Sequence, residues 1–159
     1  MKLLTFLSLT PFLMSAAVAQ TANDVVGSWK LLSYEVEAQA TGQKGPIMGA
    51  KPTGSVTFTP DGRVSFVLTG EARQAGKTDA EKAELLNTLV AYAGTYTTNG
   101  ETWATQVEVA WNPEWVGTKQ VRNYKVAGGQ LVITTPWRVM SNWADKGVTR
   151  SIVTFERSK

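Results

Sequence analysis

Polar and apolar side chains alternate through the middle of the chain, from Glu101 to Val126. A period of two puts successive side chains on opposite faces of a β-strand. Between the two alternating runs, the segment Asn112–Gly117 contains Pro113, which fixes φ, and Gly117, which accepts positive φ. The pattern therefore predicts a β-hairpin. On its first strand, one face carries Trp103, Thr105, Val107, Val109 and Trp111.

Opposite charges meet across this predicted hairpin. If the turn is centred near Trp115, Glu108 lies across from Arg122 to within about one residue. The Trp103 face is the more apolar one, and burial would make it the core side. The lumen of a ligand-binding barrel can nevertheless be polar. The sequence leaves open whether Glu108 and Arg122 face inward or outward.

Turn signals divide the rest of the chain into further short strands. Pro60-Asp61-Gly62, Asn99-Gly100 and Gly128-Gly129 are each typical of tight turns. Besides the two strands of the central hairpin, we expect strands at 25–37, 54–59, 63–69, 94–98, 130–135 and 148–157. The prediction is an all-β protein, an eight-stranded up-and-down antiparallel barrel that removes its sheet edges by closing. A β-sandwich is the alternative.

Two connections depart from this pattern. Thr78-Asp79-Ala80-Glu81 matches a capping box, which begins a helix. Six apolar residues that follow share one side of a helix, so we expect an amphipathic helix packed on or across the sheet, between the third and fourth strands. They are Leu85, Leu86, Leu89, Val90, Tyr92 and Ala93. The loop 38–53, with Ile47 and Met48 at its centre, is either a flap over an opening or a solvated connection.

The first nineteen residues predict export. A basic Lys2, an apolar run and the site Ala17-Val18-Ala19 match a secretory signal peptide, residues 1–19. The run contains Pro11 and is shorter than the roughly 20 residues of a membrane span, so we expect no stable membrane insertion. The remaining residues, 20–159, fit one domain. We expect a periplasmic or secreted protein.

Composition excludes several classes of chemistry. The chain has no Cys and no His, which removes disulfides, thiolate or imidazole metal sites and His-based catalysis. We predict no metal and no cofactor. With 16 Lys and Arg against 13 Asp and Glu, and no basic cluster, we expect no nucleic-acid partner.

Several motifs taken together resemble the bacterial lipocalin-like domain family, of the calycin superfamily. They are Gly27-Ser28-Trp29-Lys30-Leu31, Phe58-Thr59-Pro60-Asp61-Gly62-Arg63, Ala91-Tyr92-Ala93-Gly94-Thr95-Tyr96, Val107-Glu108-Val109, Asn112-Pro113 and Trp115-Val116-Gly117. The resemblance spans nearly all of residues 20–159. It implies a small barrel that binds a small, mostly apolar molecule, but no agreed substrate or activity. It also implies that Trp29 packs beneath an arginine, here Arg157 or Arg150, as a plug at one end of the barrel. Histidines often precede Val-Glu-Val in the family; Ala104-Thr105-Gln106 stands there instead, so no role of those histidines transfers.

Glu108 and Arg122 lead the candidate ligand-binding residues. Inside the lumen they would orient a polar head group; outside, they would form an exposed ion pair worth less than about 1 kcal/mol. The other candidates are Gln106, Tyr124, Ser33, Trp103 and Trp111. Trp103 and Trp111 fit the pocket, the underside of the helix or an oligomer contact equally well. Trp115, Trp137 and Trp143 lie in loops, where they either mark a binding rim or cap the core.

Three functions fit these observations. The first is an exported protein that binds a small apolar or amphipathic molecule inside the barrel. The second is a cofactor-independent isomerase or cyclase that uses Glu108 with Tyr124 or Arg122. The third is an interaction module that uses its tryptophan surface as a contact, for example in a homodimer.

Overall fold

The computed structural model describes residues 24–159, apart from the side chain at position 142. The predicted signal peptide, 1–19, lies outside the described residues. The strands are β1 (Gly27–Ala38), β2 (Lys44–Pro46), β3 (Thr53–Phe58), β4 (Arg63–Thr69), β5 (Leu89–Thr98), β6 (Thr102–Ala110), β7 (Lys119–Ala127), β8 (Gln130–Thr134), β9 (Arg138–Val139) and β10 (Val148–Arg157). The helices are α1 (Asp79–Asn87) and the 3₁₀ helices η1 (Pro113–Trp115) and η2 (Ser141–Lys146).

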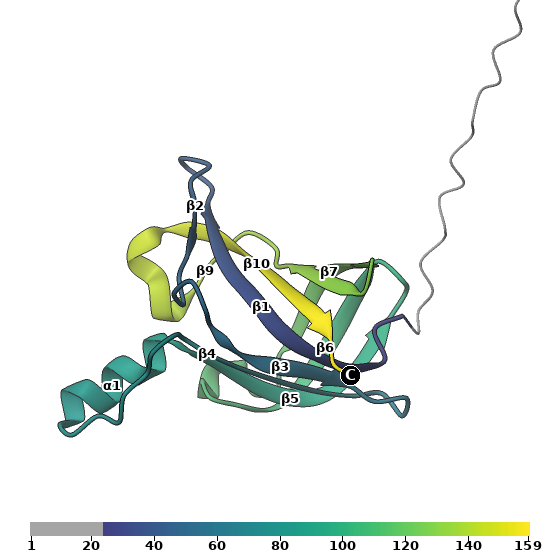
Figure 1. Cartoon of the computed structure of the whole chain (residues 1–159), viewed down its shortest axis with the longest axis horizontal. Helices are drawn as coiled ribbons and strands as arrows, with labels where there is room; N and C mark the ends of the chain where they lie inside the picture. The colour runs from purple at the N-terminus through teal and green to yellow at the C-terminus, as the bar shows by residue number, and fades with distance from the viewer. Residues whose placement is uncertain (1–23) are drawn as a thin grey trace, which may run out of the picture.

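Eight of these strands close into an antiparallel barrel (Figure 1). The sheet runs in the order β1-β3-β4-β5-β6-β7-β8-β10, and β10 pairs back onto β1 from Trp29↔Arg157 to Ala38↔Thr149. The short strands β2 and β9 add to β1 and β10 at one end of the barrel. The predicted eight-stranded barrel is confirmed, and the sandwich alternative is wrong.

The barrel has one end closed by packing. Trp29, Phe58, Trp103 and Phe155 are among the largest fully buried side chains, and all come from strand positions near that end. Phe58 contacts the rings of both Tyr96 and Trp103 edge-to-face, with centroids 5.0 and 4.9 Å away. The closed end is a packed apolar core with no room for a ligand.

A β-bulge in β1 decides which of its side chains enter the barrel. Leu31 pairs with Phe155 and Ser33 with Thr154, so Leu32 is an extra residue between them. Such an insertion reverses the alternation of faces. Before the bulge Trp29 and Leu31 are buried; after it Tyr34 and Val36 are. An uninterrupted alternation from Trp29 would place Ser33 inward, but the bulge turns Ser33 outward and Tyr34 inward.

A second bulge lies where β6 pairs with β5. Ala93 pairs with Val109 and Gly94 with Val107, which leaves Glu108 as the extra residue. Trp103, Thr105 and Val107 are buried, as their apolar face predicted. Val109 comes after the bulge and is 60% exposed, so its placement on that face is wrong.

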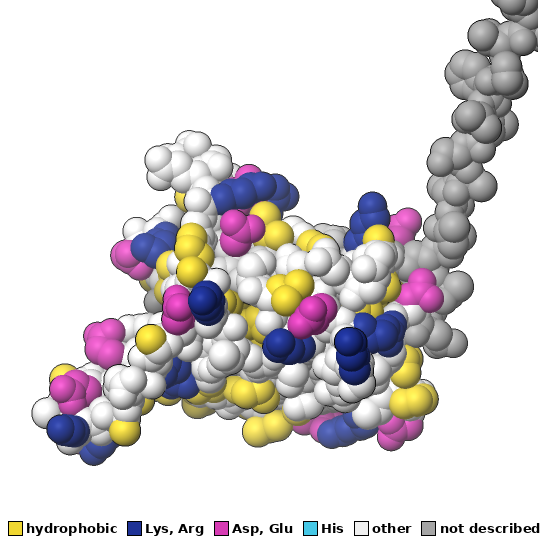
Figure 2. All heavy atoms as spheres, in the orientation of Figure 1, with side chains coloured by type: hydrophobic (Ala, Val, Ile, Leu, Met, Phe, Trp, Pro, Cys, Tyr) yellow, Lys and Arg dark blue, Asp and Glu magenta, His cyan; other side chains and the backbone are white. Residues whose placement is uncertain are grey.

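The capping box begins α1 as predicted. Thr78 Oγ1 accepts from the Glu81 N–H (3.2 Å), and a Glu81 carboxylate oxygen accepts from the Thr78 N–H (2.9 Å). The helix ends at Asn87, however, and Leu89–Ala93 belong to β5, where alternation places them on two faces. No residue of α1 is buried, and the helix extends away from the barrel with acidic and basic groups on its surface (Figures 1 and 2). The expected amphipathic helix packed on the sheet is therefore wrong.

Candidate functional site

The half of the barrel away from the Trp29 end encloses a small chamber. Its volume is about 10 Å³, roughly the space that one water molecule needs. Apolar side chains share its wall with guanidinium, phenol and hydroxyl groups. The lining residues are Tyr34, Phe66, Val90, Tyr92, Trp115, Arg122, Ile133, Thr135, Arg138 and Val153.

Arg122 is one of two cations in this lining. It projects inward from β7, and only 5% of the residue is exposed. Its guanidinium donates to the Val121 carbonyl (2.9 Å) and to the Gln120 side-chain oxygen, both of which are neutral. Among the ion pairs of residues 24–159, none includes Arg122. A buried guanidinium without a counter-charge carries a large desolvation cost.

Arg138 is the second cation, and it enters the chamber from β9. Its Cζ lies 5.8 Å from the centroid of the Trp115 ring. Its Nε is buried and has no hydrogen-bond partner among the described residues. Burial, and then the positive charge of Arg122, lowers the pKa of Arg138 to about 10. That value is still far above neutral pH, so the Arg138 guanidinium is charged there.

Two tyrosines share the chamber with these cations. The Tyr34 hydroxyl lies 2.8 Å from the Ser151 hydroxyl, and Tyr92 stacks on Phe66 with centroids 5.0 Å apart. Burial raises the pKa of both tyrosines above 10.0, although Arg122 and Arg138 act in the opposite direction. Both phenols therefore stay protonated at neutral pH and are hydrogen-bond donors.

Side chains from η2 and from the loop after β2 cover the chamber and form its roof. Trp143 of η2 packs edge-to-face on Tyr34, with centroids 5.5 Å apart, and its indole N–H donates to the Asn87 carbonyl (3.1 Å). Met48 and Met140 are buried in the same core cluster. The Met48 carbonyl accepts from the Glu71 N–H (2.8 Å), which fixes the loop after β2. The loop predicted as a flap or a solvated connection thus contributes a buried residue.

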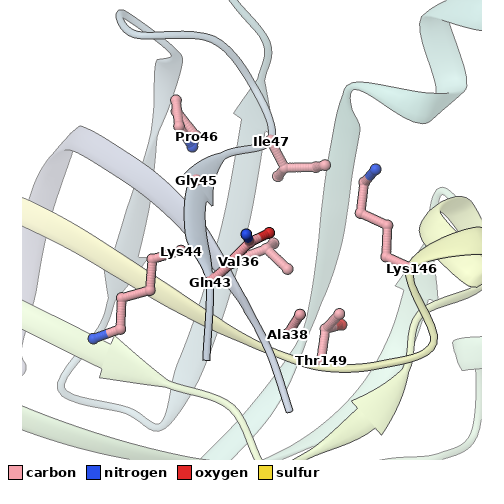
Figure 3. A pocket seen from close by; sticks show the side chains of 9 residues that line it. All are labelled: Val36, Ala38, Gln43, Lys44, Gly45, Pro46, Ile47, Lys146 and Thr149. Carbon is pink, nitrogen blue, oxygen red and sulfur yellow. The ribbon is translucent and has the colours of Figure 1, made fainter. Parts of the chain in front are cut away.

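A second cavity opens beside this roof, at the mouth of the barrel (Figure 3). Its volume is about 290 Å³, and it is lined by Val36, Ala38, Gln43, Lys44, Gly45, Pro46, Ile47, Lys146 and Thr149. On β1, Val36 of the mouth is the next inward position after Tyr34 of the chamber. Figure 3 shows Lys146 reaching from the η2 side toward Ile47, while Lys44 points away. The mouth and the chamber therefore follow one another along the same strand.

Residues 26–158 match the model of a lipocalin-like domain. The chain belongs to the lipocalin-like domain family. Among curated proteins, none matches it. Two solved β-barrel structures resemble this lipocalin-like barrel. A redesigned β-barrel is 13% identical, with a TM-score of 0.43, and the match covers 91% of this chain and 100% of that chain. EF1p2_mFAP2b bound to DFHBI is 12% identical, with a TM-score of 0.44 and coverage of 89% and 100%.

The predicted pairing of Glu108 with Arg122 in this lipocalin-like barrel is wrong. Arg122 pairs in register with Trp103 and faces inward, whereas Glu108 lies on the outer face. There Arg63 donates to both Glu108 carboxylate oxygens, at 3.0 and 2.8 Å. Trp103 pairs with Arg122 and Gln106 pairs with Lys119, which centres the hairpin between Asn112 and Pro113 and not at Trp115, so the residue opposite Arg122 is Trp103.

The remaining predicted ligand-binding residues lie outside the chamber. Trp103 and Tyr124 are buried toward the closed end, where Trp103 Nε1 donates to Thr105 (3.0 Å) and the Tyr124 hydroxyl contacts Thr98 (2.8 Å). Three others are displaced to the outer surface of the barrel by the bulges or by their own alternation. They are Ser33, Gln106 and Trp111. The Gln106 side chain donates to the Gly117 carbonyl (2.9 Å). Trp111 lines an outer groove with Val67 and Val109.

The predicted plug residues meet at the closed end of the lipocalin-like barrel. The Arg157 Cζ lies 4.1 Å from the Trp29 ring centroid. Its guanidinium donates to the Val26 carbonyl (2.9 Å) and to the Asp24 carbonyl (2.8 Å). Arg150, the second candidate, instead donates to Glu37 (2.8 Å) and lies over Trp137 (4.6 Å).

Sequence reasoning missed most of the chamber. Arg138 lies in a segment expected to be a loop, and nothing in its neighbourhood distinguishes it from a solvated arginine. Uninterrupted alternation would place Tyr34 on the face opposite Trp29, and the bulge at Leu32 has no marker such as glycine. Of the loop tryptophans, Trp115 and Trp143 pack on the chamber tyrosines and Trp137 is 38% exposed. In residues 24–159 no helix is long and apolar enough to cross a membrane, and no group of three or more acidic side chains is placed to hold a metal ion.

Proposed function

We propose that this protein is an exported lipocalin-like carrier that binds a small amphipathic molecule through the open end of its barrel. The proposal rests on two cavities that follow one another along β1. The mouth lies at Val36 and the chamber at Tyr34. A ligand that occupies both would place its apolar part in the mouth and its polar end in the chamber. The volume of the mouth, about 290 Å³, suits a ligand of small size.

The roof is the part that must move for such a ligand to enter fully. Met48 comes from the loop after β2 and Trp143 from the short helix η2, and methionine side chains adapt easily to new packing. The chamber itself is small, about 10 Å³, so binding expands it as the roof side chains shift. A preformed mouth of mixed polarity beside an adaptable roof supports a carrier more than a rigid receptor.

The isomerase or cyclase alternative depended on Glu108 as an acid or base in the cavity. That carboxylate is ion-paired with Arg63 on the outer face. The lining of the chamber includes no Asp or Glu, and its two tyrosines have raised pKa values, which makes them poor bases at neutral pH. No observation favours catalysis over binding.

Native mass spectrometry of the protein from its own host tests the carrier proposal. We expect a co-purifying small molecule whose retention falls in the variant Ala38→Trp, because a large ring there fills the mouth. Ala127→Trp is the matched control, since Ala127 is exposed at the closed end of the barrel, beside Gln130. Absence of any bound molecule, or equal loss in both variants, would contradict the proposal.

Export is tested on the same material. Cleavage after Ala19 would leave Gln20 as the first residue of the mature protein. N-terminal sequencing or intact-mass measurement should therefore find a chain that begins at Gln20. A chain that retains residues 1–19 would overturn this part of the proposal and leave the binding site unaffected.

A further inference from the structure

We propose that the polar end of the ligand is a carboxylate, held in the chamber between Arg122 and Arg138. This inference deepens the proposed function and rests on it, because it concerns the head group of the same ligand. Two guanidinium groups enter one small chamber from β7 and β9, and its lining includes no acidic residue. The chamber is built for a negative charge that residues 24–159, as far as the structure describes them, do not supply.

The hydrogen-bonding state of the two arginines supports an external partner. Arg122 has only neutral partners, which are the Val121 carbonyl, the Gln120 side-chain oxygen and the Tyr92 hydroxyl. Arg138 Nε is buried without an acceptor among the described residues. Buried arginines in proteins are normally paired with carboxylates, because pairing compensates the cost of desolvation. Glu37, next to Val36 on β1, binds Arg150 and Lys44 on the outer surface.

The neighbouring groups complete a set of donors for an oxyanion. The hydroxyl groups of Tyr34 and Tyr92 line the same chamber and can donate at neutral pH. A guanidinium offers two parallel N–H groups, which match the two oxygens of a carboxylate. A planar carboxylate also needs less expansion of a chamber of about 10 Å³ than a tetrahedral phosphate would.

The path out of the chamber determines the rest of the ligand. From the arginines, the inward positions of β1 lead past Tyr34 to Val36 and the mouth, where Pro46 and Ile47 add apolar surface. A chain of several carbons attached to the carboxylate would pass beneath Trp143 and lie in this mouth. The inferred ligand is therefore an amphipathic monocarboxylic acid.

Paired probes separate the charge of the head group from the apolar tail. Calorimetric titration at pH 7 compares decanoate, decanol and decyl phosphate on the mature protein. We expect decanoate to bind at least about tenfold more tightly than decanol, because only the acid meets the two guanidinium groups. Arg122→Met and Arg138→Met should each remove this preference while leaving the affinity for decanol within about twofold.

Two further variants test whether the preference for decanoate depends on the position of the charge that is removed. Arg63→Met makes the same exchange on the outer face, where Arg63 pairs with Glu108, and should leave the preference unchanged. Arg122→Lys retains the charge and should retain part of the preference for decanoate. This variant tests the role of Arg122 if Arg122→Met does not fold. Circular dichroism confirms that each variant is folded.

Four other outcomes would overturn the proposed carboxylate site. Equal affinity for decanoate and decanol would overturn the carboxylate site and leave the carrier proposal intact. Tighter binding of decyl phosphate would overturn the assignment to a carboxylate. Failure of all three probes to bind at their solubility limits would overturn this inference, while a co-purified neutral molecule would still support the carrier. Loss of preference in Arg63→Met would attribute it to the overall charge of the protein and would also overturn the site.

Discussion

The charges of Arg122 and Arg138 lower the stability of the folded protein. Each guanidinium leaves water on folding, and no carboxylate among the described residues pairs with either one. Their mutual repulsion adds to this cost, as the lowered pKa of Arg138 shows. Residues that serve a ligand are often retained at such a cost, because binding supplies the missing interaction.

Replacing Arg138 should therefore stabilise the protein. We expect Arg138→Met to raise the free energy of unfolding by about 1 kcal/mol, since methionine keeps the apolar contact with Trp115 and removes an uncompensated charge. Urea denaturation measures this change. Arg150→Met is the control with the opposite sign, because it leaves the half-buried Glu37 without its guanidinium and should lower stability by about 1 kcal/mol. Destabilisation by Arg138→Met would show that Arg138 has a structural role.

The buried tyrosines predict a loss of stability in alkaline solution. Tyr92 has its pKa raised above 10.0 by burial, so the unfolded chain loses that proton first as the pH rises. Its contribution is fully present below pH 10 and is lost as the pH rises through the folded value. Arg138 acts in the opposite direction, because its folded pKa of about 10 lies below its ordinary 12.5. Tyr92→Phe removes only the tyrosine contribution.

Stability measured by urea at several pH values between about 9 and 11 tests this effect. We expect the variant Tyr92→Phe to lose stability less steeply above pH 10 than the parent protein does. Tyr124→Phe is a suitable comparison, because its hydroxyl already contacts Thr98 toward the closed end. Identical slopes in Tyr92→Phe and the parent would contradict a buried, protonated Tyr92.

At the scale of single elements, alternation predicted the strands well and their faces less well. A period of two identifies a strand but cannot reveal an inserted residue, because a bulge changes the phase of the pattern and not its period. One such residue, Leu32, turns Tyr34 inward and Ser33 outward. The helix shows the same limit. Leu85 and Leu86 are helical, but Leu89 and Val90 already pair with β4.

The bulge between β5 and β6 does leave a signal in the sequence, which is Gly94. A Cβ atom at this position would lie 1.9 Å from the Gln106 carbonyl oxygen and 2.9 Å from the carbonyl carbon. Only glycine allows the two backbones to approach so closely. The glycine therefore maintains the bulge that directs Glu108 outward to Arg63.

We expect Gly94→Ala to lower the free energy of unfolding by more than about 2 kcal/mol, because the backbone on one strand must shift. Thermal and urea denaturation measure this loss. Gly45→Ala is the matched control, since a Cβ atom there would meet nothing within 4 Å. The control should change stability by less than about 0.5 kcal/mol. A mild effect of Gly94→Ala would show that the bulge is not tightly constrained.

At the scale of the whole molecule, the sequence predicted the barrel but not the contents of its open half. The eight barrel strands and their order follow from patterns within short segments and were predictable, whereas the short strands β2 and β9 were not. The chamber combines β1, β5 and β7 with side chains from η1 and β9. No local pattern indicates that Arg138 and Trp115 meet there, because loop side chains are placed by tertiary packing. The residues of the candidate site could therefore be recognised only in three dimensions.

The two ends of the barrel should behave as independent units. Arg157 closes one end by covering Trp29 and donating to the carbonyls of Val26 and Asp24, whereas Arg122 and Arg138 lie in the other half. We expect Arg157→Met to lower the free energy of unfolding by about 1–3 kcal/mol, because two charge-assisted hydrogen bonds and a cation–π contact are lost together. The same variant should keep the preference for decanoate over decanol.

Effects of sites far apart and without shared partners normally add, so the double variant Arg157→Met with Arg138→Met should show the sum of the two stability changes. Urea denaturation and calorimetric titration of the three proteins test both expectations. Loss of the ligand preference in Arg157→Met would show that the closed end controls the chamber.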